Sequence, residues 1–198
     1  MELSSREIWT AVHGMVLGAG FLLAFSGGLV GLWGLRSGWV TAEGAKKLLR
    51  QLAVATWGMA ILAWLAVLLG TYVIYPWYRA KLPASATTQP ALVTGAPGSL
   101  AAAPAAGVDL TRFPKYLLLS RPQTKEWHEF GMEWKEHIAW FCPILATAVA
   151  YVVARYGRHV IGDAKLRRAL LILFTVSFFC AAVAGAFGAL INKAAPTR

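Results

Sequence analysis

Four apolar runs, each long enough to cross a bilayer, decide what this chain can fold into. A helix of about 20 apolar residues spans the hydrocarbon core, and four such helices are expected at about 8–35, 52–75, 126–156 and 166–191. We therefore predict an all-α integral membrane protein in which residues 1–198 form one membrane domain, a four-transmembrane-helix bundle. The first run has no basic segment or small-residue cleavage site before it, so we expect it to stay as a permanent span.

The composition and charge of the chain favour a lipid environment over a nucleic-acid partner. Hydrophobic residues make up 58% of the sequence and charged residues only 14%, which is far from the usual balance of a soluble domain. The formal net charge is +10, but the basic residues flank the spans. We therefore expect a basic rim that faces anionic lipid head groups, and no nucleic-acid binding.

The connections between the runs predict an orientation. The first and third connections are short and basic, whereas the second, at about 79–125, is long and contains an uncharged Ala-, Pro- and Gly-rich stretch at 84–107. That stretch is predicted to be flexible. Because basic residues in short loops mark the cytoplasmic side, we predict both termini outside in a bacterial-type inner membrane. The long outer loop is then the surface expected to dock a periplasmic or other outer-face protein.

The segment from Glu126 to Tyr156 joins a charged, aromatic helix start to an apolar span that begins at Trp134. Four carboxylates recur at steps of three or four and predict an acidic stripe: Glu126, Glu129, Glu133 and Glu136. Aromatic side chains and one imidazole form a second stripe: Trp127, Phe130, Trp134, His137 and Phe141. We expect the second stripe to turn into the bundle, because the carboxylates can then stay in interfacial water.

His13 in the first helix is the predicted partner of His137. With both termini outside, the two residues lie about five and about three positions into their spans, so their depths differ by roughly 3 Å. Two imidazoles at one depth on two helices suit axial ligation of the iron of one b-type haem. Gly20 would leave room for the porphyrin, and Trp134 and Phe141 would pack on it. Over these two helices the arrangement resembles the general plan of small membrane cytochromes b.

Other chemistry stays open at the same end of the chain. Glu133 and His137, four residues apart, are spaced to hold a metal ion, with His128 as a further ligand. A belt of aromatic residues ends the second helix, where it anchors the helix and offers a place for a quinone head group: Tyr72, Tyr75, Trp77 and Tyr78. Cys142 and Cys180 lie at different depths, so no disulfide is predicted between them.

The motifs of common enzymes are missing from the sequence. It contains no nucleotide-binding, catalytic-triad, zinc-peptidase or covalent-haem motif, so we do not expect catalysis by this chain alone. The predicted function is a small integral membrane subunit or anchor of a respiratory or photosynthetic electron-transfer complex, with one b-type haem near the outer face. One alternative is a cofactor-free structural subunit that packs against other membrane helices, pigments or lipids. Another is a metal-handling membrane protein that uses the Glu/His cluster.

Overall fold

The computed structural model describes residues 4–35, 41–83 and 109–196, and the described residues are largely helical and contain no strand. Four helical spans are long and apolar enough to cross a membrane, and we number them in chain order: Ser5–Gly34, Glu43–Tyr78, Pro122–Gly162 and Ala164–Ala194. The predicted all-α class is therefore confirmed, and so are four helices long and apolar enough to span a membrane. The flexible stretch predicted at 84–107 lies outside the described residues.

Each of the first three spans contains one π-helical turn. The first span consists of α1 (Ser5–Ala11), a π-helical turn (Val12–Val16) and α2 (Leu17–Gly34). The second consists of α3 (Ala42–Leu69), a π-helical turn (Gly70–Ile74) and α4 (Tyr75–Tyr78). The third consists of α6 (Pro122–Glu126), a π-helical turn (Trp127–Met132) and α7 (Glu133–Gly162), and α8 (Ala164–Ala194) forms the fourth.

Side chains at the helix starts satisfy backbone N–H groups that have no partner within the helix. Ser4 and Glu7 form a capping box at the start of α1. The Thr41 side chain accepts a hydrogen bond from the backbone of Gly44 at the start of α3. Asp163 accepts two such bonds at the start of α8 and so allows a tight turn between α7 and α8.

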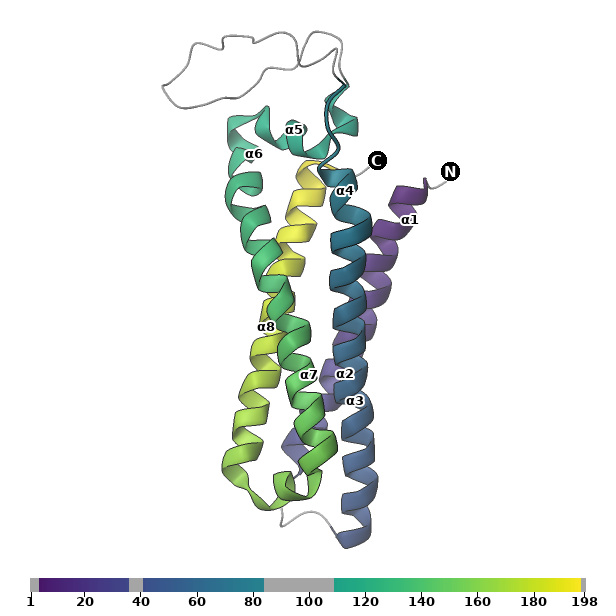
Figure 1. Cartoon of the computed structure of the whole chain (residues 1–198), viewed down its shortest axis with the longest axis vertical. Helices are drawn as coiled ribbons and strands as arrows, with labels where there is room; N and C mark the ends of the chain where they lie inside the picture. The colour runs from purple at the N-terminus through teal and green to yellow at the C-terminus, as the bar shows by residue number, and fades with distance from the viewer. Residues whose placement is uncertain (1–3, 36–40, 84–108, 197–198) are drawn as a thin grey trace.

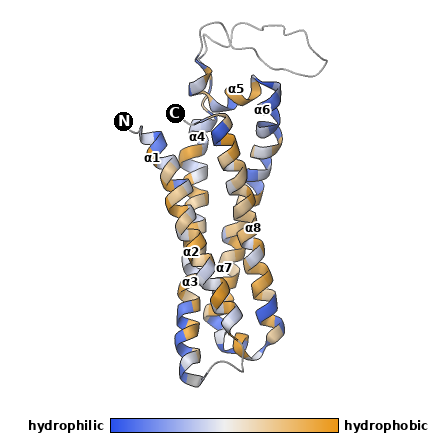
Figure 2. Ribbon diagram, turned by 180° about the vertical axis from the view of Figure 1, so that it is seen from behind, coloured by the Kyte–Doolittle hydropathy of each residue, from blue (hydrophilic) through white to orange (hydrophobic). Residues whose placement is uncertain are grey.

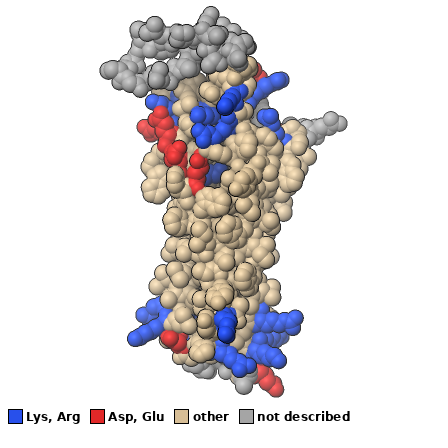
Figure 3. Space-filling view, viewed as in Figure 1, with Lys and Arg blue, Asp and Glu red and all other residues tan. Residues whose placement is uncertain are grey.

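The four spans pack side by side, with α2 on α3, α3 on α7, α7 on α8, and α8 back on α2 (Figure 1). The start of α1 and the end of α8 lie at the same end of the molecule, which we call the terminal end; the opposite end is the turn end. Apolar residues dominate the middle of the spans (Figure 2), and on the face shown in Figure 3 the charged residues gather near the two ends. Which end faces the cytoplasm stays a prediction.

The main hydrophobic core occupies the middle and the turn-end half of the spans. Phe174 of α8 is fully buried in it and stacks on Phe25 of α2, with 5.3 Å between the ring centroids. Gly28 of α2 faces the Phe174 ring, and Gly31 faces Leu52 of α3. Because these glycines have no side chain, they allow α2 to approach its two neighbours closely.

A second hydrophobic cluster closes the terminal end. Its buried members come from the second span, the third span, α8 and the short α5 (Pro114–Leu119): Tyr78, Leu118, Met132, Ile191 and Ala195. The fully buried Leu118 holds α5 against the spans. This part of the predicted outer loop is thus an ordered cover for the ends of the helices.

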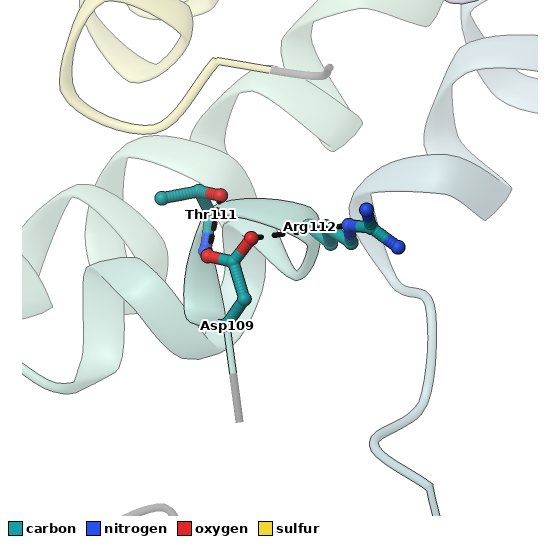
Figure 4. A network of polar contacts seen from close by, with 3 residues as sticks. All are labelled: Asp109, Thr111 and Arg112. Atoms are coloured by element: carbon teal, nitrogen blue, oxygen red, sulfur yellow. Dashed lines mark hydrogen bonds and ion pairs between the residues drawn. The ribbon is translucent and has the colours of Figure 1, made fainter. Parts of the chain in front are cut away.

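Asp109 organises the entry to this cover (Figure 4). Its Oδ1 accepts hydrogen bonds from the backbone N–H of Thr111 at 3.0 Å and from the Thr111 hydroxyl at 2.6 Å. Arg112 lies 3.8 Å from the other carboxylate oxygen. The bonds from Thr111 hold the pKa of Asp109 below its usual range, and Arg112 adds to this. The carboxylate therefore stays charged at neutral pH and caps the short 3₁₀ helix Leu110–Arg112.

Candidate functional site

A layer of polar and glycine residues lies between the main core and the terminal cluster. Its members come from all four spans, and we call them the polar layer: His13, Gly70, Lys135, Glu136 and Gly188. Along the third span, for example, the layer falls between Met132 of the terminal cluster and Cys142 of the main core. Polar side chains at such a depth are costly, so by default they indicate a function.

His13 lies in one π-helical turn and packs against the start of another on the second span. It lies within the first turn, Val12–Val16, and its ring contacts Gly70, the residue that opens the second turn. A Cβ atom at Gly70 would lie only 3.0 Å from Cε1 of the imidazole, so the glycine makes room for the ring. Turns of this type are frequent at functional sites in helices.

The two nitrogens of His13 have different environments. The imidazole hydrogen-bonds the backbone of Ala66, whereas Nδ1 is buried and has no hydrogen-bond partner among the described residues. A carbonyl can only accept a hydrogen bond, so Nε2 is the donor to Ala66 and Nδ1 carries the lone pair. Nδ1 is therefore a free acceptor inside the protein, where an unsatisfied polar atom requires an explanation.

Lys135 of α7 reaches across to α8. A Cβ atom built on Gly188 would lie 3.3 Å from Cε and 3.5 Å from Nζ of the lysine, so the missing side chain of Gly188 leaves space for the lysine. The ammonium group is close enough to His13 for its charge to act on the imidazole. Among the described residues, no carboxylate lies within ion-pair distance of Lys135. The polar layer therefore holds a free acceptor and a cation without a direct counter-ion.

Glu136 links the polar layer to the terminal-end surface. Its side chain hydrogen-bonds the hydroxyl of Tyr75, and the guanidinium of the exposed Arg79 donates to the same hydroxyl at 2.8 Å. Tyr75 stacks on the buried Tyr78, with 6.3 Å between their ring centroids. Two tyrosines of the predicted aromatic belt therefore connect Arg79, near water, with the interior of the spans.

His137 lies on the other side of its own helix from Lys135. Lys135, two positions earlier, faces His13 and α8, and two residues of an α-helix turn by about 200° while rising about 3 Å. In agreement, His137 is exposed, and its Nδ1 lies 2.7 Å from the carbonyl oxygen of Glu133 in the preceding turn. The common depth of the two histidines stays a prediction, and the contacts of His13 with Gly70 and of His137 with Glu133 differ from a shared site.

The residues expected to surround a porphyrin have other surroundings. Trp134 and Phe141 are 51% and 56% exposed, so the aromatic stripe that we expected to turn inward lies on the outer surface at these positions. Gly20 packs on Leu62 of α3, whose Cδ1 would lie 3.2 Å from a Cβ atom at that glycine. The expectation failed because lipid, unlike water, does not drive aromatic side chains into the bundle.

The predicted metal ligands and the cysteines have other surroundings. Glu133 is exposed, and Nδ1 of His128 lies 2.7 Å from the hydroxyl of Tyr78. Within the described parts of the chain, no three His, Cys, Asp or Glu side chains gather as a metal site would require. Cys142 and Cys180 are both free thiols, and the Cys142 backbone carbonyl accepts a hydrogen bond from Ser177.

The sequence-based prediction did not include Lys135, Gly70 or Gly188, although helical spacing places Lys135 on the buried face of α7. It lies seven residues before Cys142 and eleven before Ala146, on the face of α7 that is buried against its neighbours. Comparisons with protein-family models, with curated proteins and with solved structures find no match for this chain.

Proposed function

We propose that this chain is an integral membrane subunit of an electron-transfer complex and that its polar layer binds the head group of a quinone. The observation that carries the proposal is the buried Nδ1 of His13, which has no hydrogen-bond partner among the described residues and lies near the ammonium of Lys135. A ligand that satisfied both groups would remove the cost of leaving them unpaired.

A quinone fits these groups because its oxygens can accept or donate hydrogen bonds. In the reduced form, a hydroxyl donates to the lone pair on Nδ1 of His13; in the oxidised form, a carbonyl accepts from Lys135. The apolar tail of the ligand stays in the lipid, from which the ligand enters between the spans. The hydroxyl of Tyr75 hydrogen-bonds both Glu136 and Arg79, and so connects the polar layer with the terminal-end surface.

The remaining parts of the complex come from other chains. A redox centre that exchanges electrons with the quinone belongs to a neighbouring subunit. The exposed apolar surface of the spans suits contact with membrane subunits and lipids. The cover formed by α5 at the terminal end is the surface that we expect a periplasmic or other outer-face protein to contact.

The predicted b-type haem stays a prediction. A haem held by His13 and His137 requires both imidazoles in one cavity, whereas His13 is turned toward the second span and His137 is exposed. Quinone binding uses His13 and Lys135, whose groups already lie near each other, so we favour it. A cofactor-free structural subunit is the alternative in which the free nitrogen of His13 has no role.

Direct binding of a short-chain quinone tests the proposal. We expect the purified protein in detergent micelles to bind it in a calorimetric titration, and we expect His13→Leu to weaken the binding by about ten-fold, which corresponds to roughly 1.4 kcal/mol for one buried hydrogen bond. The matched control is His159→Leu, because His159 is exposed near the opposite end of α7. No binding by the wild-type protein, or equal binding by both variants, would refute the proposal.

A reduced-minus-oxidised absorption spectrum of the same preparation tests the haem prediction separately. Bands of b-type haem that disappear in both His13→Ala and His137→Ala would establish haem ligation and displace the quinone proposal. Metal analysis of the wild-type protein and of Glu133→Ala tests the metal-handling alternative, since only a bound metal would be lost with that carboxylate.

A further inference from the structure

A basic pocket lies between α3 and α7 near the turn end, far from the polar layer. Its volume is about 440 Å³, within the range of about 300–1,000 Å³ that is usual for small-molecule sites. α3 contributes residues 49, 50 and 53, and α7 contributes residues 153–159. We infer that this pocket binds the phosphate of an anionic phospholipid.

The mouth of the pocket carries a concentration of positive charge. Arg155, Arg158 and His159 of α7 line the pocket, and Arg50 lines it from α3. The Arg155 guanidinium lies 5.5 Å from the centroid of the Tyr156 ring, which orients it. In the described structure, none of these three arginines forms an ion pair with a carboxylate. Their charge is available to an anion.

The carboxylates near the turn end do not line the pocket. Asp163 accepts hydrogen bonds from the backbone N–H groups of Lys165 and Leu166, and Glu43 lies two turns before Arg50 on α3. The lining residues include no acid. The charged residues that line the pocket are therefore all basic and suit an anion.

The floor of the pocket is apolar and lies beside a break in α7. Tyr156 has non-helical dihedral angles (φ −122°, ψ 18°), and the next residue, Gly157, packs on Leu49, whose Cδ2 would lie 3.0 Å from a Cβ atom there. Leu49, Ala53 and Val153 provide the apolar lining. A basic mouth above an apolar floor matches a phosphate that is attached to acyl chains.

The position of the pocket also favours a lipid over a free phosphate. The lining residues belong to the second and third spans. Along α7 they run from the buried Val153 to the exposed Arg158 and His159, so the pocket lies at the boundary between the apolar part of this span and its charged end. Lipid head groups occupy this boundary in a bilayer, and basic pockets between transmembrane helices bind anionic head groups. The inference holds for either orientation of the chain, because phospholipids occur in both leaflets.

Native mass spectrometry of the full chain, released from detergent with added phosphatidylglycerol or phosphatidylcholine, tests the inference. We expect the wild-type protein to retain phosphatidylglycerol in preference to phosphatidylcholine. Removing one basic residue near a lipid head group weakens binding by about five-fold, so the double variant Arg50→Gln/Arg158→Gln should lose roughly 25-fold. The matched control is Lys46→Gln/Lys47→Gln, which removes the same charge from the same end of α3 but leaves the pocket lining intact.

Each outcome supports or overturns the inference. A large loss in the arginine variant and little change in the lysine variant would support a built site. Equal losses in both variants, or no preference of the wild-type protein for phosphatidylglycerol, would overturn it. If glycerol phosphate at the same concentration as phosphatidylglycerol displaced the lipid, the pocket would be a site for soluble phosphate, and the lipid inference would be overturned. Circular dichroism of each variant establishes that the helices are intact before binding is compared.

Discussion

The close contact between Gly28 and Phe174 predicts a sharp difference between two neighbouring glycines of α2. A Cβ atom on Gly28 would lie 2.5 Å from Cζ and 2.7 Å from Cε1 of the Phe174 ring, whereas carbon atoms in contact prefer about 3.5–4.0 Å. The ring would have to move by about 1 Å. It is fully buried and stacked on Phe25, so this movement disturbs the main core.

The control is Gly27→Ala, one residue away on the same helix. A Cβ atom on Gly27 meets only the Cβ of Ala55, at an ordinary 3.6 Å, so this change gains helix propensity of up to about 1 kcal/mol without a clash. Gly28→Ala makes the same gain but overpacks the core, at a cost of about 1–3 kcal/mol. The difference between the two variants therefore isolates the clash.

Equilibrium unfolding in mixed micelles with dodecyl sulfate, followed by far-ultraviolet circular dichroism, measures that difference. We expect the free energy of unfolding of Gly28→Ala to be lower than that of Gly27→Ala by about 1–3 kcal/mol. Adding Phe174→Leu to Gly28→Ala should recover part of the loss, since the smaller side chain gives the new methyl group space. Equal stability of the two alanine variants would refute the packing described for this contact.

Two further predictions concern the fourth span. Ser177→Ala removes a buried hydrogen bond of 2.8 Å to the Cys142 carbonyl on α7, and it should lower the free energy of unfolding in the same assay by about 0.6 kcal/mol; Ser26→Ala, which removes a bond within one helix, is the control. The pKa of Asp163 is held below its usual range by hydrogen bonds from two backbone N–H groups, those of Leu166 and Lys165. The stability that Asp163 contributes is therefore fully present above about pH 4 and is lost as the pH falls through the folded-state pKa. Melting temperatures of wild type and Asp163→Asn should differ at neutral pH and converge in acid, and a difference that grew in acid would contradict this.

The main elements of the fold could be predicted because they follow from composition and length. A membrane leaves a chain few ways to satisfy its backbone other than helices, and four apolar runs of sufficient length define four spans. The π-helical turns could not be predicted, because each depends on a local backbone shift that leaves no pattern in the sequence.

The face that each helix turns inward was the harder problem, and the third span explains why. Aromatic residues mark the buried face in water, so Trp134 and Phe141 were expected inside. In lipid, helices associate through small residues and polar contacts instead, and the buried stripe of α7 is accordingly Cys142, Ala146 and Val149. One rule of helix geometry, applied from Cys142 back by seven residues, places Lys135 on that stripe.

Because the aromatic face of α7 points outward, Lys135 replaces His137 as the candidate functional residue of the third span. A histidine on the lipid side, such as His137, can bind a ligand only with help from another molecule. A lysine on the packed side must instead be accommodated by the protein itself, and Gly188 opposite Lys135 provides the space. The same reasoning applies to His13, whose ring is accommodated by Gly70. In each case a glycine on the neighbouring span gives room to an ionisable side chain, and this pairing, more than the aromatic residues, distinguishes the polar layer from ordinary helix packing.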